Sequence, residues 1–484
     1  MGVHEQLIDI WSAGLSCQVR DIDADFFNLG GDSVTALRVR VLAEEAGLVF
    51  KTADLFRYPT IRELAAHLAA GPEIVGVSGG QLRREGGGDE GGVALPLLPM
   101  QASILGSEGG TAEYVVQDWF DVSGRLDRQR LDEAYRAITR RHEALRLRFP
   151  LHLAGIAQLV RPSANVSLRY ESVRRLRDLD EAVSRARAEE CASIDLATAE
   201  PQQLMALEID VDTWRVVWTV HHAVADGWSG AVFWDELLRE YTSPLTDEPP
   251  SYRAYVELAT RAHLRSEMGE VLSPYIPRDA VAGGPPRPGL HSISLPSTAL
   301  VHDAVGRHGF TAAELFFGAY ARFLGCVTGE TVFDAASIDS GRDVPVAGVD
   351  RMMGCLVGQI HTRVDCLDVS GPRFLHRLRE RRVEAGSFAR PVDIDALFLF
   401  QNYPDPVATA IERDAVSFDG LRLNGMGSAE ATRVPVSIVV HEANAQYACD
   451  VKYRAELFDP ATIETFGDLY KDAVASELEA LAAS

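Results

Sequence analysis

The run Trp214-Arg215-Val216-Val217-Trp218-Thr219-Val220 leads into His221-His222-Ala223-Val224-Ala225-Asp226-Gly227 and so ends in two adjacent histidines. Its aromatic and β-branched residues predict a mostly buried strand. After Trp228-Ser229-Gly230, apolar residues recur at helical spacing from Ala231 to Tyr241, with Ser229 as a candidate cap. We therefore expect the histidines at a strand-to-helix turn. Successive strand residues point to opposite faces, so one histidine can face the core and the other a cavity.

The composition limits the class of protein. A chain of 484 residues is too long for one ordinary domain. Its formal net charge of -23 would repel a phosphate backbone, so we expect no nucleic-acid partner. The start of the chain has no basic region followed by a long apolar core, and no apolar stretch is long enough to cross a bilayer. We expect a cytoplasmic protein without a membrane partner.

The six cysteines are scattered along the chain. They form no Cys-x-x-Cys pair and are not joined by paired histidine ligands, which is typical of reduced thiols and not of a zinc site. We expect no metal.

Glycine-rich stretches divide the chain. Gly71 to Gly92 has the composition of a flexible linker, which predicts a small domain over 1–70, a linker over 71–93 and a large domain over 94–484. A second stretch rich in proline and glycine, from Met268 to Pro288, predicts two lobes, at about 94–265 and 290–484. A nucleotide-binding role for these glycines is poorly supported, because no Gly-Lys-Ser/Thr closes the loop.

The first seventy residues predict a helical bundle. Leu7 to Trp11 indicates a first helix, Leu37 to Leu42 a second, and Thr60-Ile61-Arg62-Glu63 is a capping box that opens a last one. Between them, Gly30-Gly31-Asp32-Ser33 delivers Ser33 to a helix start. From these four residues alone, a loop with an N-cap is the simpler interpretation.

The wider stretch resembles a peptidyl carrier protein. The resemblance rests on Phe26-Phe27, on Leu29-Gly30-Gly31-Asp32-Ser33 and on Leu55-Phe56-Arg57-Tyr58-Pro59-Thr60-Ile61. It implies that Ser33 carries 4′-phosphopantetheine, installed by a phosphopantetheinyl transferase, whose thiol holds an acyl group as a thioester. A helix N-terminus suits this phosphate, because its dipole and free amides favour negative charge.

The histidine motif also resembles a known family. His-His-x-x-x-Asp-Gly is the signature of the condensation-domain superfamily of nonribosomal peptide synthetases. This resemblance implies an α/β, V-shaped domain with two chloramphenicol-acetyltransferase-like lobes, and an acyltransferase that forms peptide bonds. It implies that His222 accepts a proton or orients the nucleophile, two roles that the sequence leaves open. It also implies that His221 and Asp226 hold the turn and that Gly227 leaves room for the reacting carbonyl.

Further stretches resemble the same family in order. Pro96-Leu97-Leu98-Pro99-Met100-Gln101 is similar to its opening motif, in a form closer to domains that take a D-configured donor. Arg141-His142-Glu143-Ala144-Leu145-Arg146 is similar to the second, and it implies that Arg146 forms an ion pair with Asp226. Phe398-Leu399-Phe400-Gln401-Asn402 fits a later motif.

Four residues are assigned to the substrate tunnel. Trp228 and Ser229 are expected to shape it, with an ordinary core or cap role equally open, and Gln401 and Asn402 are its other candidates. Gly358-Gln359 departs from the usual residues of the family, and a His-x-x-x-Pro-Phe motif is missing near 389–392, which leaves the substrate side less defined.

The resemblance implies three partners: an aminoacyl carrier downstream as acceptor, an adenylation domain upstream in the parent synthetase, and the transferase that modifies Ser33. Two alternatives remain, a degenerate domain that docks carriers or recruits tailoring enzymes, and an epimerization domain.

Overall fold

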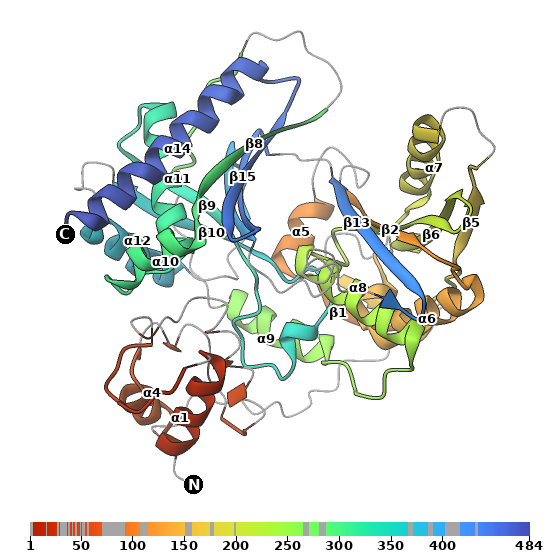
Figure 1. The fold of residues 1–484 in the computed structure, drawn as a ribbon, viewed down its shortest axis with the longest axis horizontal. Helices are drawn as coiled ribbons and strands as arrows, with labels where there is room; N and C mark the ends of the chain where they lie inside the picture. The colour runs from red at the N-terminus through yellow and green to blue at the C-terminus, as the bar shows by residue number, and fades with distance from the viewer. Residues whose placement is uncertain are drawn as a thin grey trace.

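The computed structural model describes residues 3–15, 17–26, 29, 36, 39–40, 42–43, 46–48, 50, 54–55, 58–69, 92–106, 114–150, 157–174, 179–197, 200–264, 271–279, 287–365, 371–385, 391–401, 417–430 and 434–484. These residues form a small helical unit and two larger α/β lobes, each with its own hydrophobic core (Figure 1). The fold class expected from the sequence is confirmed.

The N-terminal unit contains α1 (Val3–Gly14) and α4 (Ile61–Ala69). Its core includes Trp11 and Phe26, whose ring centroids lie 4.9 Å apart. Thr60 caps α4, because the backbone N–H of Glu63 donates to the Thr60 hydroxyl at 3.2 Å and this hydroxyl donates to the Glu63 carboxylate at 3.0 Å. Ser33, most of the predicted second helix and the linker over 71–91 lie outside the described residues.

The first lobe is built on a six-stranded sheet in the order β12-β13-β2-β7-β6-β5. The strands are β2 (Val115–Ser123), β5 (Arg169–Ser172), β6 (Gln202–Asp210), β7 (Thr213–His221), β12 (Ser417–Phe418) and β13 (Leu421–Glu430). A smaller sheet joins β1 (Val93–Pro96), β4 (Ala157–Val160) and β3 (Leu147–Arg148). The helices are α5 (Pro99–Leu105), α6 (Arg128–Arg141), η2 (Glu143–Arg146), α7 (Leu179–Ser193), α8 (Gly227–Thr242) and α9 (Tyr252–Leu264).

Strand β7 is buried on both faces, as its apolar run predicts. Trp218 stacks on Phe233 of α8, with ring centroids 3.9 Å apart. The next residue toward the N-terminus, Val217, belongs instead to the cluster formed with α7. Helices on opposite faces therefore fix the strand and hold its C-terminal end in place.

The second lobe has a six-stranded sheet in the order β10-β9-β11-β14-β15-β8. The strands are β8 (Pro288–Ser297), β9 (Val332–Asp339), β10 (Gly358–Asp365), β11 (Ala396–Gln401), β14 (Val436–Ala443) and β15 (Gln446–Arg454). The helices α10 (Thr298–Gly306), α11 (Ala312–Thr328), α12 (Pro372–Ala385) and α14 (Pro460–Ala482) pack beside this sheet (Figure 1).

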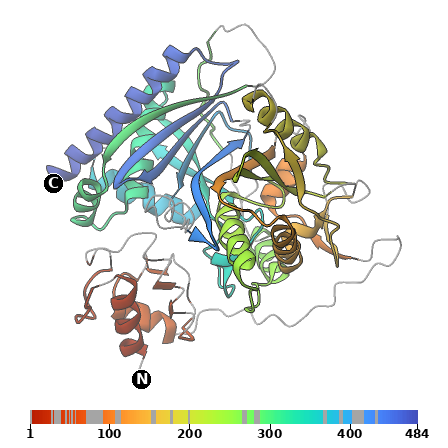
Figure 2. The same cartoon turned by 45° about the vertical axis from the view of Figure 1, so that its right-hand side comes forward.

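The second half of the chain contributes segments to the first lobe, so the contiguous lobe ranges expected from the sequence need amendment. Strand β13 lies late in the chain, yet it pairs with β2 of the first lobe. Figures 1 and 2 both show β13, in blue, beside the strands of that lobe. The loop over 340–357, which contains η4 (Val349–Arg351), places Val344, Met352 and Leu356 in the first lobe's core. Two segments of the second half of the sequence thus complete the first lobe.

Candidate active site

The histidine pair lies between β7 and α8, as the sequence predicts. Hydrogen bonds fix the backbone of this turn. The N–H of His222 donates to the carbonyl of Tyr114 at 2.8 Å, next to the start of β2. The buried amide of Gln101, on α5, donates through Nε2 to the carbonyl of Ala223 at 2.7 Å. The turn is therefore anchored by two elements outside the motif.

His221 is buried and has a defined ring tautomer. Its side chain Nδ1 accepts the backbone N–H of Ala223 at 3.0 Å, so in the neutral ring the proton is on Nε2. Its own N–H donates to the carbonyl of Pro201 at 3.0 Å. A ring that closes its own turn in this way supports the structural role predicted for His221.

His222 is the more accessible histidine, with 30% of its side chain exposed. Its Nδ1 lies 3.1 Å from the carbonyl oxygen of Ala225. A carbonyl only accepts, so Nδ1 carries a hydrogen. The other nitrogen, Nε2, lies 3.4 Å from Oε2 of Glu430. The ring is thus held at Nδ1 by a backbone carbonyl, and its Nε2 faces the Glu430 carboxylate.

Glu430 ends β13, where it is paired in register with Val116 near the start of β2. Its other carboxylate oxygen accepts a hydrogen bond from Nζ of Lys452, on β15 of the second lobe. Burial favours the neutral carboxyl, but the hydrogen bonds and charges of His222 and Lys452 outweigh it and hold the pKa of Glu430 well below its usual range. Burial likewise opposes a charged imidazole, yet the hydrogen bond and charge of Glu430 raise the pKa of His222 above its ordinary value.

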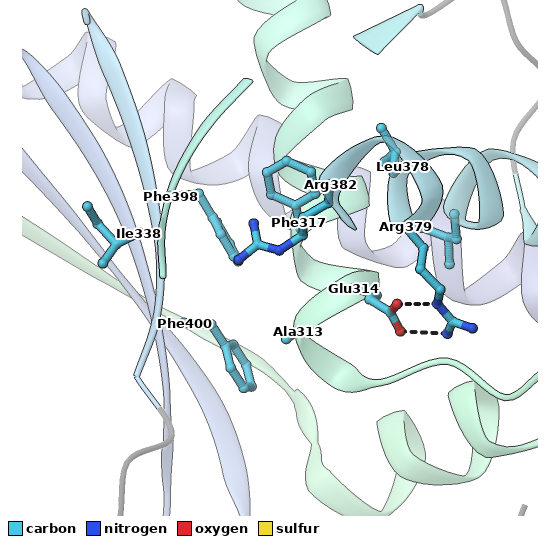
Figure 3. Close-up of a pocket in the computed structure, with 10 residues that line it drawn as sticks. Ala313, Glu314, Phe317, Ile338, Leu378, Arg379, Arg382, Phe398 and Phe400 are labelled. Atoms are coloured by element: carbon cyan, nitrogen blue, oxygen red, sulfur yellow. Dashed lines mark hydrogen bonds and ion pairs between the residues drawn. The ribbon is translucent and has the colours of Figure 1, made fainter. Parts of the chain in front are cut away.

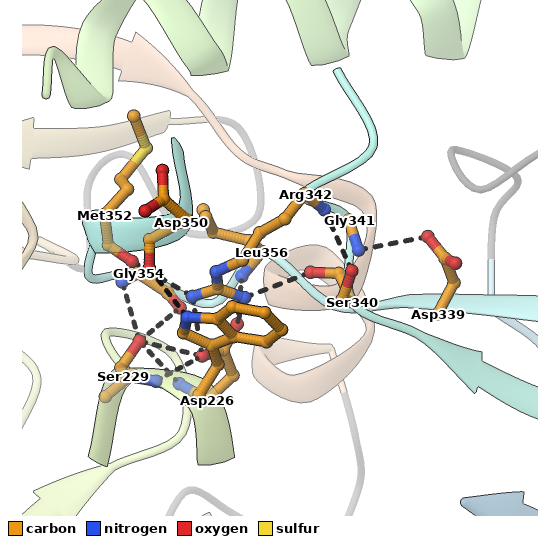
Figure 4. A network of polar contacts seen from close by, with 12 residues as sticks. Asp226, Ser229, Asp339, Ser340, Gly341, Arg342, Asp350, Met352, Gly354 and Leu356 are labelled. Carbon is orange, nitrogen blue, oxygen red and sulfur yellow. Dashed lines mark hydrogen bonds and ion pairs between the residues drawn. The ribbon is translucent and has the colours of Figure 1, made fainter. Parts of the chain in front are cut away.

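Asp226 is the N-cap of α8 (Figure 4). Its Oδ1 accepts the backbone N–H of Ser229 at 2.9 Å and the Ser229 hydroxyl at 2.8 Å. Its Oδ2 accepts the backbone N–H of Leu356 at 3.1 Å. The cap expected at Ser229 is therefore corrected: the helix begins earlier, and Ser229 is its third residue.

The ion-pair partner of Asp226 is Arg342, on the loop that follows β9 (Figure 4). Its two terminal nitrogens donate to the two carboxylate oxygens at 2.9 and 3.0 Å. They also donate to the carbonyls of Ser340 and Met352 at 3.1 and 3.0 Å. Arg342 is only 1% exposed, so the pair is fully desolvated. It ties the loop over 340–357 to the start of α8.

The predicted ion pair between Arg146 and Asp226 is wrong. Arg146 is half-buried at the end of η2 and donates to the carbonyl of Arg161. The motif that contains it does contact α8, but through Arg141 and His142, which bind Glu236 at 2.9 and 2.7 Å. The motif over 141–146 therefore contacts the middle of α8, whereas the N-terminus of α8 is held by Arg342 from the second half of the chain.

The remaining candidates are distributed around this centre. The Trp228 ring lies 5.0 Å from the Arg342 guanidinium, and its Nε1 donates to the carbonyl of Asp350 at 2.7 Å. The Ser229 hydroxyl also contacts the backbone of Gly354. These contacts support packing roles for Trp228 and Ser229. Gly227 is exposed as the first residue of α8.

Gln401 is the last residue of β11, paired in register with His441. It alternates with Phe398 and Phe400, which line a small cavity of about 70 Å³ among α11, α12 and the sheet (Figure 3). Gln401 therefore belongs to the opposite face of the sheet from this cavity, and Asn402 lies outside the described residues.

Sequence reasoning missed three residues that hold the motif: Arg342, Glu430 and Lys452. Each lies more than a hundred positions after the histidines, and no spacing connects them to the motif. Gln101 appeared in the opening motif, but nothing in the sequence indicated that it binds the histidine turn.

The part of the chain that the structure describes contains neither a candidate metal-binding cluster nor a candidate membrane-spanning helix. Its residues include no group of three or more histidine, cysteine, aspartate or glutamate side chains placed to hold a metal ion. None of the described helices is long and apolar enough to cross a membrane.

Relatives match most of this chain. The AMB antimetabolite synthetase AmbE of Pseudomonas aeruginosa is 26% identical over 522 residues, which covers 97% of this chain and 24% of AmbE. A linear gramicidin synthase of Brevibacillus parabrevis is 25% identical over 551 residues, covering 99% of this chain and 10% of that protein. The chain thus spans no more than 24% of the length of these two relatives.

Solved structures share the fold of the large domain. The condensation domain of the monacolin K polyketide synthase MokA superposes with a TM-score of 0.63 at 15% identity, covering 79% of this chain and 97% of that one. The X-domain from teicoplanin biosynthesis gives a TM-score of 0.64 at 18% identity, covering 83% of this chain and 99% of that one.

Two family models match the chain in succession. The phosphopantetheine attachment site matches residues 5–68, and the condensation domain matches residues 93–270. The alignments to AmbE and to the linear gramicidin synthase cover 97% and 99% of this chain, so they include both matched segments. This chain therefore matches a phosphopantetheine attachment site followed by a condensation domain, and it is similar to peptide synthetases.

Proposed function

We propose that this chain forms a peptide bond by transferring an acyl or peptidyl group, held as a thioester at Ser33, to the amine of an aminoacyl group on a downstream carrier. The observation that carries the proposal is the placement of His222. Its ring contacts the Ala225 carbonyl through Nδ1, and its side chain is 30% exposed, whereas His221 and Asp226 are buried.

The chemistry needs no external reagent. Phosphopantetheine at Ser33 would supply the thiol that holds the acyl group as a thioester and so activates its carbonyl. Transfer would form a bond from the amine nitrogen to this carbon, break the carbon–sulfur bond and pass the proton that the amine loses to the released thiol. An amine with a pKa of about 8 is already partly neutral near pH 7, so positioning and charge stabilisation can supply most of the rate.

The proposal assigns three partners. A phosphopantetheinyl transferase modifies Ser33, an adenylation domain upstream in the parent synthetase supplies the activated residue, and an aminoacyl carrier downstream delivers the nucleophile. Gln401 and Asn402 are proposed to line the path of the substrates.

A loading experiment tests the reaction. Ser33 would be loaded with peptidyl pantetheine, an aminoacyl carrier added, and the elongated product followed by mass. We expect no product from Ser33→Ala, and turnover at least ~100-fold lower from His222→Ala. The matched control is His376→Ala, which removes an exposed histidine of α12 and should react like the wild type. Wild-type turnover from His222→Ala would refute the role of His222.

The same experiment separates the alternatives. Binding of loaded carriers with no product under any condition would indicate a docking or recruitment platform. Racemisation of a Ser33-bound aminoacyl group without any acceptor would indicate an epimerization domain. The retention of both His222 and Gly227 favours condensation.

A further inference from the structure

A charged chain of three side chains crosses from the second lobe to the histidine motif. It runs from Lys452 on β15 to Glu430 at the end of β13 and then to Nε2 of His222. Glu430 is 32% exposed and Lys452 30% exposed. These side chains therefore lie at an accessible surface of the site and can meet a substrate.

The two contacts of His222 define its protonation state. Nδ1 faces the carbonyl of Ala225, and Nε2 faces a carboxylate oxygen of Glu430. Neither a carbonyl nor an ionised carboxylate can donate a hydrogen bond. Both ring nitrogens must carry hydrogen for both contacts to be favourable, and only the imidazolium does so.

A neutral pair, with a carboxylic acid donating to Nε2, is the other arrangement to consider. Lys452 opposes it, because its ammonium donates to the second oxygen of Glu430 and favours the ionised carboxylate. The lowered pKa of Glu430 and the raised pKa of His222 agree with this assignment.

Other charges near His222 do not change the assignment. On its own loop, Asp226 also favours the imidazolium, but its carboxylate is paired with Arg342. Lys452 is bonded to the oxygen of Glu430 that does not face His222. Among the described residues, Glu430 therefore contributes the largest stabilisation of the charged ring.

We propose that Glu430 is a positioning residue that holds His222 as an imidazolium, so that His222 serves as a hydrogen-bond donor to the acyl oxygen and not as the base that takes the amine proton. This inference rests on the proposed function. The contact of 3.4 Å is long for a hydrogen bond, so the Nε2–H can share its hydrogen with a second acceptor while the ring stays in place. Negative charge that develops on the carbonyl oxygen would then meet a donor that is already charged and oriented.

The first test does not depend on turnover. The full chain would be labelled at histidine Cε1, the His222 resonance assigned with His222→Gln, and its titration followed by NMR. We expect a pKa above the ordinary value of about 6.5 in the wild type, lowered by about one unit in Glu430→Gln. Glu430→Asp retains the charge on a shorter side chain and should give an intermediate value. Glu442→Gln, which removes an exposed glutamate from β14, is the matched control and should leave the titration unchanged.

The second test uses the pH dependence of product formation. If the imidazolium is the active form, activity falls as His222 loses its proton, and this alkaline limb moves down in Glu430→Gln together with the NMR pKa. An activity that instead appears as His222 loses its proton would overturn the donor role. An unchanged NMR pKa in Glu430→Gln, or an equal shift in Glu442→Gln, would overturn the positioning role. Absence of wild-type turnover would count against the proposed function and leave the NMR result standing.

Discussion

Replacing Arg342 with methionine tests the ion pair that the structure places at the centre of the site. The change keeps most of the side-chain volume but leaves the buried carboxylate of Asp226 without its cation. Breaking a buried pair from one side costs about 3–5 kcal/mol. Asp226 keeps three hydrogen-bond donors, two from Ser229 and one from Leu356, which favours a cost near the lower end of this range. The carbonyls of Ser340 and Met352 lose the hydrogen bonds that Arg342 donates, which raises the cost. We expect a loss of about 4 kcal/mol.

Urea denaturation followed by tryptophan fluorescence measures this loss. With an m-value of about 3 kcal/mol/M, the midpoint of the condensation-domain transition should fall by about 1 M. Arg146→Met is the control, because Arg146 is half-buried, and it should cost about 1 kcal/mol or less. The double variant Arg342→Met, Asp226→Asn should lose less stability than the sum of the losses measured for the two single variants, because the two residues interact. A loss below about 1 kcal/mol for Arg342→Met, or an equal loss for Arg146→Met, would refute the assignment.

Three further outcomes are expected. Gly341→Ala should prevent folding or cost more than about 4 kcal/mol of stability, because at φ +66° the new Cβ would lie 1.8 Å from a backbone carbonyl oxygen. The control Gly329→Ala, at φ +71° with open space around the new Cβ, should cost only about 1 kcal/mol. Equal thermal stabilities of the two variants would contradict the steric argument. Gln101→Leu should remove the hydrogen bond to the Ala223 carbonyl, cost about 1–3 kcal/mol of stability in urea denaturation and reduce turnover. Unchanged stability together with unchanged turnover would show that the turn does not depend on this bond. Because the folded state raises the pKa of His222, that group stabilises the fold fully below its unfolded pKa of about 6.5 and loses this contribution as the pH rises through the folded value. The difference in unfolding free energy between wild type and His222→Asn should therefore shrink as the pH rises above about 6.5, and a difference that grew would contradict the sign.

The sequence predicts the local parts of this site well and the distant parts poorly. The end of β7 and the start of α8 follow from the apolar run and from the cap preferences of neighbouring residues, so only the identity of the cap had to be corrected, from Ser229 to Asp226. The cation that pairs with Asp226 could not be found in this way. Arg146 follows a recognisable motif, whereas Arg342 reaches the site because a loop of the second lobe packs into the first. Hydrophobic periodicity defines which face of an element is buried, but not which distant segment covers it.

The same limit applies to Glu430. Its position follows from the register of β13 against β2, which depends on where a strand from the end of the chain joins a sheet formed near the beginning. Charged residues at strand ends are usually solvated, so nothing local distinguishes Glu430 from other carboxylates. Only the assembled sheet brings it to His222.

The contribution of the second half of the chain to the first lobe limits how synthetases can be recombined. A chimera joined within the stretch over 268–288 would place the first lobe of one parent against the second lobe of another. The foreign parent would then have to supply a fitting strand for the edge of β2, a cation for Asp226 and the apolar side chains of the loop over 340–357. Residues 93–484 are therefore best exchanged as one unit, with crossover points in the glycine-rich stretch before residue 92. A chimera joined inside this range should lose the pairing of β13 with β2 and the ion pair of Asp226 with Arg342, unless its second parent supplies matching partners.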